Sequence, residues 1–188
     1  MNEIDEIVVT GGRPLHGTVR IQGSKNTALP VMAAALLSSG TSVLRECPKI
    51  TDVFLMEKIL RELGAETWWE DHDLYLDCSH ADGTVIPEYF SGKMRCSVIL
   101  LGAMLGRNGK ARTGYPGGCV IGKRPVDLHI QVLQKLGARI VENGNEIQAT
   151  CGKLKGAEVI FPKSSVGATE QGILAAVLAE GKTVFKIG

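Results

Sequence analysis

The sequence lacks an excess of charge, a membrane-length apolar run and, at its start, the pattern typical of a secretory leader. Its 188 residues carry a formal net charge of +1, which argues against a general nucleic-acid or membrane surface. No apolar run is long enough to span a bilayer, and the acidic start MNEIDEIVV is unlike a signal peptide. We therefore expect no nucleic-acid or membrane partner, and any basic site must be local.

The sequence also lacks an ordered pattern of cysteines or histidines. Its five cysteines are widely spaced, odd in number and without a C-x-x-C pair, and its four histidines are scattered. This argues against a disulfide framework and against a zinc site. We expect reduced thiols, a cytoplasmic location, and no metal or other cofactor.

What the sequence does contain is enough apolar residues for a folded core, arranged in alternating helical and extended patterns. Hydrophobic residues make up 44% and charged residues 22%, which is typical of a globular domain. Apolar spacing predicts a helix over 52–63 and another over 27–38, with Pro30 in its first turn. Residues 65–78 predict two strands around a turn at 71–73. The fold class is therefore α/β (α+β).

A segment of the chain repeats itself. A shift of 73 residues superposes 53–78 on 126–151 without a gap and places Gly64 on Gly137. Both glycines stand where a helix C-cap is expected. Since the shift aligns helix on helix and hairpin on hairpin, the repeat is structural.

The element before this segment repeats as well. Residues 36–44 resemble 177–185, with a looser copy at 105–109. The sequence therefore predicts a unit of roughly 70 residues, made of a first helix, a strand, a second helix and a hairpin. About two and a half units are present, and we expect the third to be cut short at Gly188.

One stretch interrupts this regularity, GYPGGCVIGKRPVD at 114–127. From Gly40 to Asp52 in the first unit there are 12 residues, and from Gly109 to Pro125 in the second there are 16. The extra four residues fall in this stretch. An insertion into a repeated scaffold has no evident packing role, and loops carry functional sites, so we expect the stretch to be functional.

Three kinds of chemistry are open to the inserted stretch. Gly117 to Lys123 follows G-x-x-x-x-G-K, but Arg124 stands where a P-loop needs Ser or Thr to bind Mg²⁺, which disfavours a nucleotide-binding P-loop. Cys119 lies among glycines, near two cations and a helix start, which together favour a reactive thiolate. The alternative is an inert, buried cysteine.

The third possibility is an anion site built from several helix starts. The starts of the three first helices carry Lys25, Arg95 and Lys163, and Arg124 precedes a second helix. Helix N-termini bind anions through free N–H groups and the helix dipole. If the units pack around a pseudo-threefold axis, these cations converge. The alternative is that each is an ordinary solvated cation.

Several stretches together resemble one enzyme family. GSKNTALPVMAAALL, PGGCVIGKRPVDLHI and LKGAEVIFPKSSVGATE are similar to the UDP-N-acetylglucosamine 1-carboxyvinyltransferase family of enolpyruvyl transferases, collinearly from about residue 7 to 184. The resemblance implies an inverse α/β barrel of two domains, each built from three of the repeats. Residues 1–22 would be strands that pair with a second domain, and residues 23–188 would be most of the first.

The resemblance also implies an activity. Members of the family transfer the enolpyruvyl group of phosphoenolpyruvate to the 3-hydroxyl of UDP-N-acetylglucosamine and release phosphate, in the first committed step of peptidoglycan synthesis. The reaction passes through a tetrahedral ketal, so a general acid must protonate the methylene carbon. The alternative is a UDP-sugar-binding fragment that catalyses nothing. The family uses no metal.

Site residues follow from the match, position by position. Cys119 would be the general acid, the cysteine that fosfomycin modifies and the residue that forms a covalent pyruvate adduct. Lys25 and Asn26 would hold phosphoenolpyruvate. The family's catalytic aspartate would lie beyond Gly188, and the face left by the second domain would favour self-association. The residues implied to bind the UDP-sugar are Arg95, Arg124, Pro125, Val126, Asp127, Leu128, Lys163, Ser164, Ser165 and Val166.

Overall fold

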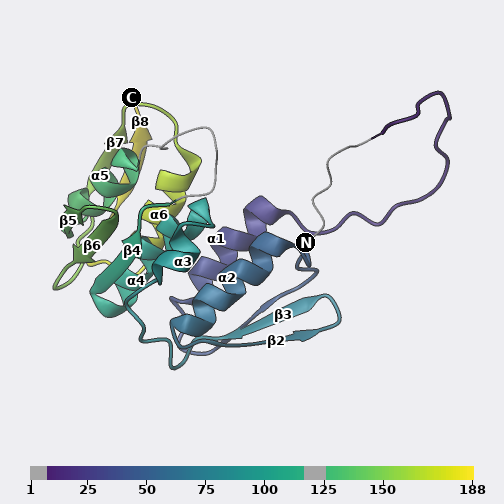
Figure 1. Ribbon diagram of the computed structural model, residues 1–188. Coiled ribbons are helices and arrows are strands. Elements are labelled where there is room, and N and C mark those ends of the chain that lie inside the picture. Colours follow the sequence, from purple (N-terminus) through teal and green to yellow (C-terminus); the bar gives the residue numbers. More distant parts are fainter. Residues whose placement is uncertain (1–7, 117–125) are drawn as a thin grey trace.

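The computed structural model describes residues 8–116 and 126–188, and two of its regions repeat one arrangement (Figure 1). The helix predicted over 52–63 and the hairpin predicted over 65–78 are both confirmed. In both regions a first helix and a strand precede a second helix and a hairpin. The first region consists of α1 (Lys25–Ala35), β1 (Thr41–Leu44), α2 (Thr51–Glu62), β2 (Glu66–Glu70) and β3 (Asp73–Asp77).

The second region has the same order of elements, preceded by two short helices. Its antiparallel sheet has strand order β4-β6-β5, which matches β1-β3-β2 in the first region. The first helix of this region is extended at its start by a 3₁₀ turn. The elements are α3 (Glu88–Ser91), the 3₁₀ helix η1 (Arg95–Ile99), α4 (Leu100–Asn108), β4 (Lys110–Gly114), α5 (Asp127–Lys135), β5 (Arg139–Asn143) and β6 (Glu146–Thr150).

Strand pairing confirms the repeat at the level of single residues. Asp77 of β3 pairs with Glu66 of β2, and Thr150 of β6 pairs with Arg139 of β5. Each residue of the second pair lies 73 positions after its counterpart in the first. A slip of one residue would turn every side chain to the other face of the sheet, so the shared register means that the two units bury equivalent positions.

The predicted C-cap glycines are confirmed as well. Gly64 has φ 95° and Gly137 has φ 94°, a left-handed conformation that only glycine adopts without strain. The residue after each glycine then donates its N–H back into the helix, at 3.0 Å from Ala65 to Leu60 and 2.9 Å from Ala138 to Leu133. These caps turn the chain from each second helix directly into its hairpin.

The first helix differs from the prediction at both ends. The sequence predicts 27–38 with Pro30 in the first turn, but α1 begins at Lys25, which puts Pro30 in the second turn. The helix starts early because the Ser24 carbonyl already accepts the Ala28 N–H at 2.9 Å. It ends early because the Ser38 N–H bonds to Ala35, three residues back, and such 3₁₀ bonds commonly close a helix.

The third region is shorter and contains a strand pair that the sequence reasoning missed. One strand precedes the helix in the sequence and the other follows it. The two strands pair in parallel, from Glu158 opposite Val184 to Phe161 opposite Ile187. A parallel pair needs a crossover connection, and the helix supplies it here. The elements are β7 (Glu158–Phe161), α6 (Val166–Ala176) and β8 (Val184–Ile187).

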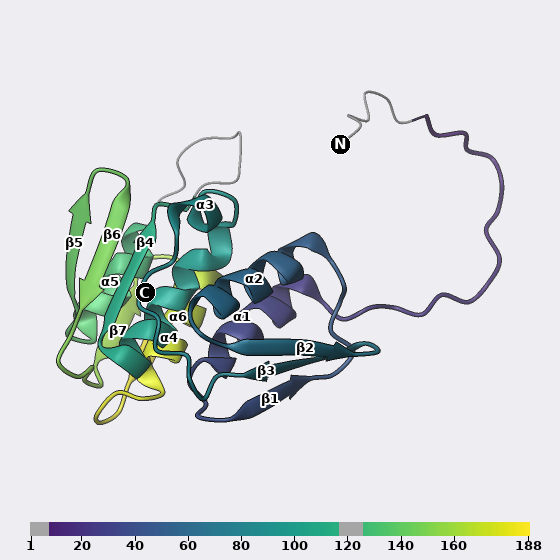
Figure 2. The ribbon, with the colours of Figure 1, turned by 60° about the horizontal axis from the view of Figure 1, so that its bottom comes forward.

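The first helices of the three regions pack together at the centre of the molecule (Figure 2). A Cβ added to Gly102 of α4 would lie 2.4 Å from the Gln171 carbonyl oxygen of α6, and one added to Gly106 would lie 3.6 Å from that of Ala175. The two backbones therefore approach closely at Gly102. Since the residue numbers of both helices rise by four from one contact to the next, α4 and α6 run in the same direction.

Helix α1 runs in this direction too. At the end of α4, the Arg107 guanidinium donates to the carbonyls of Leu36 and Ser38 at 2.7 and 2.6 Å, which caps the last turn of α1. Arg107 also donates to the Cys78 carbonyl at 2.6 Å. The three helices thus end on one side of the molecule, and their N-termini share the other.

Residues 8–22 contain no strand, although the sequence reasoning predicts strands over 1–22. Every residue from 8 to 22 is exposed, and the segment loops away from the rest of the chain (Figure 1). Its contact with the folded part includes an ion pair between Arg20 and Glu46. The predicted pairing of this segment with a second domain stays a prediction.

Two kinds of feature are absent from the described ranges, 8–116 and 126–188. Neither range holds a helix that is both long and apolar enough to cross a bilayer. Nor does either range bring together three or more His, Cys, Asp or Glu side chains in a way that could hold a metal ion.

Candidate functional site

The helix starts named by the sequence gather at one end of the molecule. Besides α1, α4 and α6, helix α5 joins this arrangement. A Cβ added to Gly167 would lie 3.2 Å from the His129 ring, and one added to Gly172 would lie 2.8 Å from Val132. Residue numbers rise along the contact in both helices, from Gly167 to Gly172 in α6 and from His129 to Val132 in α5. Helix α5 therefore runs parallel to α6. The site is therefore an end face where several helix dipoles point their positive ends outward, which favours an anion.

The start of α6 offers the most complete set of donors. Ser165 is the N-cap, and its hydroxyl accepts the Ala168 N–H at 3.4 Å. Among the described residues, the N–H groups of Val166 and Gly167 have no protein acceptor. Lys163 is exposed beside them. Two open amides and a lysine form a suitable site for a phosphate oxygen.

The start of α5 presents mainly its backbone. The side chains of Val126 and Leu128 are only 7% and 9% exposed, whereas Asp127 between them is exposed. No side chain caps this helix start within the described ranges. Among the three described residues at the start of α5 that the resemblance assigns to the UDP-sugar, Asp127 alone exposes its side chain to a ligand.

Helix α1 brings Lys25 and Asn26 to the same end. Both residues are exposed in its first turn, and the Ser24 side chain makes no cap. The Lys25 ammonium lies 2.9 Å from the Asp52 carboxylate at the start of α2, with both side chains about half exposed. Such a pair contributes at most about 1 kcal/mol, so it positions the ammonium without preventing its exchange for a ligand anion.

The side chains of the other predicted site residues are not among those that the structure describes. Cys119, Arg124 and Pro125 lie outside the described residues, and Arg95 is placed only by its backbone, as the first residue of η1. The described residues that share the end face are Lys25, Asn26, Val126, Asp127, Leu128, Lys163, Ser164, Ser165 and Val166.

The chain is firmly anchored just before the residues outside the described ranges. The Tyr115 N–H donates to the Asn145 carbonyl at 2.8 Å, and the Tyr115 hydroxyl donates to the Glu142 carboxylate. The Asn145 side chain in turn donates to Glu88 of α3 at 3.1 Å. The β5–β6 hairpin thus holds the end of β4 in place, an anchor that the sequence reasoning missed because it depends on long-range contacts.

The described cysteines have the character of structural thiols. Burial, helped by the Glu57 carboxylate, raises the pKa of Cys47 to about 11. Burial also raises the pKa of Cys78 and of Cys151, the two cysteines at equivalent repeat positions. Cys78 is fully buried and Cys151 is half-buried. Since the thiolate is the reactive form, none of these three is a suitable nucleophile at neutral pH.

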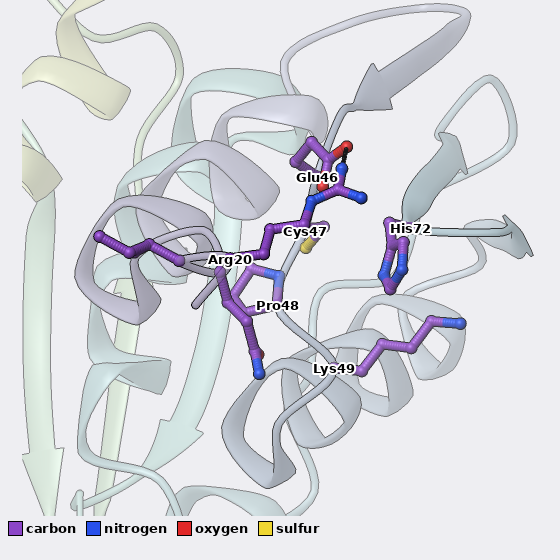
Figure 3. A pocket seen from close by; sticks show the side chains of 8 residues that line it. Arg20, Glu46, Cys47, Pro48, Lys49 and His72 are labelled. Atoms are coloured by element: carbon purple, nitrogen blue, oxygen red, sulfur yellow. Dashed lines mark hydrogen bonds and ion pairs between the residues drawn. The ribbon is translucent and has the colours of Figure 1, made fainter. Parts of the chain in front are cut away.

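A cavity of ≈ 290 Å³ lies elsewhere, between residues 20–22, the 46–49 loop and His72 (Figure 3). Its polar lining consists of Arg20, Gln22, Glu46, Lys49 and His72, with Cys47 at its wall. No residue of the end face lines it. The cavity is therefore separate from the site that the sequence indicates.

Comparison with known proteins identifies the family. Residues 9–187 match the family described as EPSP synthase (3-phosphoshikimate 1-carboxyvinyltransferase). The UDP-N-acetylglucosamine 1-carboxyvinyltransferase of Wolbachia pipientis wMel is 50% identical over 181 residues, which cover 92% of this chain and 43% of the relative. The enzyme of that name from Chlorobium chlorochromatii strain CaD3 is 45% identical over 185 residues, 97% of this chain and 44% of the relative. The chain thus spans less than half the length of these relatives.

Solved structures show the same fold at lower identity. The enolpyruvyl transferase NikO from Streptomyces tendae has a TM-score of 0.80 and 23% identity, over 93% of this chain and 41% of that one. An EPSP synthase from Acinetobacter baumannii has a TM-score of 0.72 and 20% identity, over 90% and 40% of the two chains. The chain therefore has a mixed α/β fold that matches part of an enolpyruvyl transferase.

Proposed function

The chain belongs to the EPSP synthase family, and on that premise we propose that it forms the UDP-sugar-binding part of a UDP-N-acetylglucosamine 1-carboxyvinyltransferase. The observation that carries the proposal is the shared end face, onto which the start of α1 opens with Lys25 and the start of α6 opens with Lys163 and two open amides. The identity of 50% to the Wolbachia pipientis wMel enzyme of that name supports the choice of substrate. The whole protein would form an inverse α/β barrel of two domains.

The proposed reaction moves the enolpyruvyl group of phosphoenolpyruvate to the 3-hydroxyl of UDP-N-acetylglucosamine and releases phosphate. This is the first committed step of peptidoglycan synthesis, and hence of cell-wall biogenesis. It brings two anionic substrates together, so the site must supply positive potential before they can approach. Parallel helix starts and exposed lysines supply it in a chain whose formal net charge is only +1.

Each part of the end face has a task in this proposal. The α6 amides with Lys163 and Ser164 hold the diphosphate, Asp127 at the start of α5 meets the nucleoside, and Lys25 with Asn26 holds phosphoenolpyruvate. Arg95 and Arg124 add further charge. The proposed general acid is Cys119, which protonates the methylene carbon so that the sugar hydroxyl can attack the neighbouring carbon. The general base would belong to a second domain.

The proposed location is the cytoplasm. The described thiols of Cys47, Cys78 and Cys151 are free, and free thiols are typical of a reducing compartment.

A chimera tests the reaction. We would join residues 1–188 to the remaining part of the Wolbachia pipientis wMel relative and measure phosphate release from phosphoenolpyruvate. Release should require UDP-N-acetylglucosamine, and shikimate 3-phosphate should not replace it. Cys119→Ala should lower the rate by about 100-fold or more, as expected for loss of a general acid. The matched control Cys151→Ala should leave the rate unchanged. A folded chimera that releases no phosphate would contradict the proposed reaction.

A second candidate function is binding without turnover. The observation that favours it is coverage, because the chain matches only 43% of the relative's length. In that case the chain alone binds UDP-N-acetylglucosamine and releases no phosphate from the substrate mixture. Release by the unfused chain would rule this candidate out.

A further inference from the structure

A buried pair of polar side chains joins the two helix starts that the proposed function assigns to the UDP-sugar. His129 is the third residue of α5 and is only 7% exposed, and Gln171 of α6 is fully buried. The His129 Nδ1 and the Gln171 Oε1 form a hydrogen bond. Burying a polar group is costly unless it is hydrogen-bonded, and this bond satisfies the Gln171 Oε1 and the His129 Nδ1. The pair is therefore a specific link between α5 and α6.

The other edge of the His129 ring lies against the first turn of α6. A Cβ added to Gly167 would lie 3.2 Å from the ring Cε1 and 3.3 Å from Nε2. Such distances are tighter than ordinary van der Waals contact, so the absence of a side chain at Gly167 lets the ring approach the backbone. The ring is held between this backbone and Gln171, which fixes its position from two sides.

This placement connects the two halves of the proposed UDP-sugar site. His129 directly follows the Val126–Leu128 segment at the start of α5. Gly167 belongs to the turn of α6 whose open amides would hold the diphosphate. The two helix starts are distant in sequence, and the ring spans from one to the other. Any shift of the ring would change the spacing between the nucleoside side and the diphosphate side of the site.

We propose that His129, held by Gln171 against Gly167, is a positioning residue that sets the spacing between the starts of α5 and α6 for the diphosphate of the UDP-sugar. This inference rests on the proposed function of the same end face. His129 acts through the amides of Val166 and Gly167. A hydrogen bond weakens steeply once its distance or angle departs from the preferred range, so a small change at this buried pair should alter ligand affinity.

The test follows the backbone amides of Val166 and Gly167 by NMR while UDP-N-acetylglucosamine is added to the whole 188-residue chain. Both amides should shift in a saturable way. Gln171→Leu and His129→Asn should each raise the dissociation constant by about ten-fold or more, as expected for loss of one hydrogen bond to a charged group. Gln171→Glu, which keeps an acceptor for the ring, should retain more affinity than Gln171→Leu.

A control on the same interface separates positioning from stability. Val132 lies one turn along α5, fully buried, at the place where α5 meets Gly172 of α6. Val132→Ala should lower the melting temperature and leave the dissociation constant within about two-fold of the parent. A loss of affinity as large as that of Gln171→Leu would mean that packing alone matters and would overturn the positioning role.

The remaining outcomes distinguish this inference from the proposed function. Should His129→Asn or Gln171→Leu fail to fold, Gly167→Ala replaces them, since its methyl group pushes on the same ring and should weaken binding similarly. If the parent chain binds the UDP-sugar and the folded variants bind it equally well, the positioning role is wrong and the proposed function stands. If the UDP-sugar shifts neither amide of the parent chain, the proposed function of this face fails, and the positioning role fails with it.

Discussion

Helices α1 and α6 occupy the same place in their repeats, yet equivalent faces of the two helices are covered in α1 and open in α6. Alignment of Gly40 with Gly181 puts Met32 opposite Ile173 and Leu36 opposite Val177. Met32 and Leu36 are 0% and 2% exposed, whereas Ile173 and Val177 are 50% and 59% exposed. Helix α1 contacts α2, but no helix follows α6 among the described residues.

The comparison teaches that the burial of a repeat position depends on the neighbouring elements as well as on its residue type. In α4, Leu101 and Leu105 occupy the equivalent positions and are both 1% exposed. Only the third unit leaves the face open, and its exposed residues are as apolar as the buried ones. The predicted self-association through a face left by a second domain stays a prediction, and the apolar face of α6 is a candidate surface for it.

The largest expected effect comes from truncating the covered position. Met32→Ala should lower the free energy of unfolding by about 2–5 kcal/mol, because it leaves a cavity in the core. Ile173→Ala, at the equivalent open position, should change it by no more than about 0.5 kcal/mol. Urea unfolding of the two variants measures both values. Equal losses would contradict the comparison, since they would show that Ile173 is buried in solution.

The covered side of α6 gives a second test, somewhat smaller in effect. A methyl group on Gly102 would meet the Gln171 carbonyl oxygen at 2.4 Å, which forces α4 and α6 apart. Gly102→Ala should therefore cost about 1–3 kcal/mol of unfolding free energy. Gly106→Ala is the matched control, because its methyl group would meet α6 at an ordinary 3.6 Å. That variant should be neutral or stabilised by about 0.5–1 kcal/mol, as judged from the same unfolding curves.

A titration sharpens the comparison further, because the covered first unit buries the Cys47 thiol. Its pKa is raised from 9.0 to about 11 by burial and by Glu57. Between these two values the unfolded chain releases the proton and the folded chain keeps it. Stability should therefore fall as the pH rises from about 9 towards 11, by at most about 3 kcal/mol.

The measurement is the urea midpoint of the parent chain and of Cys47→Ala across that pH range. The variant should lose less stability with rising pH than the parent does. Identical pH profiles would show that the Cys47 thiol is not protected in the folded state.

The smallest expected effect is a difference in reactivity between Cys78 and Cys151, the cysteines at equivalent repeat positions. Cys78 is fully buried, whereas Cys151 is half-buried and its thiol lies 3.8 Å from the Leu105 carbonyl. Burial raises the pKa of both thiols. In the folded chain Cys151 should react with iodoacetamide faster than Cys78, and both should react much more slowly than in urea. Peptide mass spectrometry gives the two rates, and a faster Cys78 would reverse the comparison.

The repeat could be predicted from the sequence because it depends on local signals. These signals are the glycine C-caps at Gly64 and Gly137 and the apolar spacing of 52–63. The local preference of each agrees with the way the folded chain packs. The predicted start of α1 was wrong because Pro30 was assigned to the first turn of the helix, whereas the Ser24 carbonyl sets the actual start. The strands predicted over 1–22 are not seen over 8–22, and their pairing needs a partner outside these residues.

The candidate site was only partly accessible to sequence reasoning. Helix starts carrying Lys25 and Lys163 could be found from their position in the repeat. The buried pair of His129 and Gln171 could not, because it depends on how α5 packs against α6. A histidine at the third position of a helix gives no signal of its own. The same holds for the anchor at Tyr115, whose partners lie on a distant hairpin.

Calorimetry with UDP-N-acetylglucosamine tests the central claim most directly, namely that the helix starts of this chain bind a UDP-sugar. The chain should give a saturable heat of binding, and Lys163→Ala should weaken the affinity by about ten-fold, as expected for one charge-assisted contact. Lys153→Ala, a change at an exposed lysine paired with Glu180, should leave the affinity unchanged. Absence of any heat with the folded parent chain, at ligand concentrations up to several millimolar, would contradict the claim.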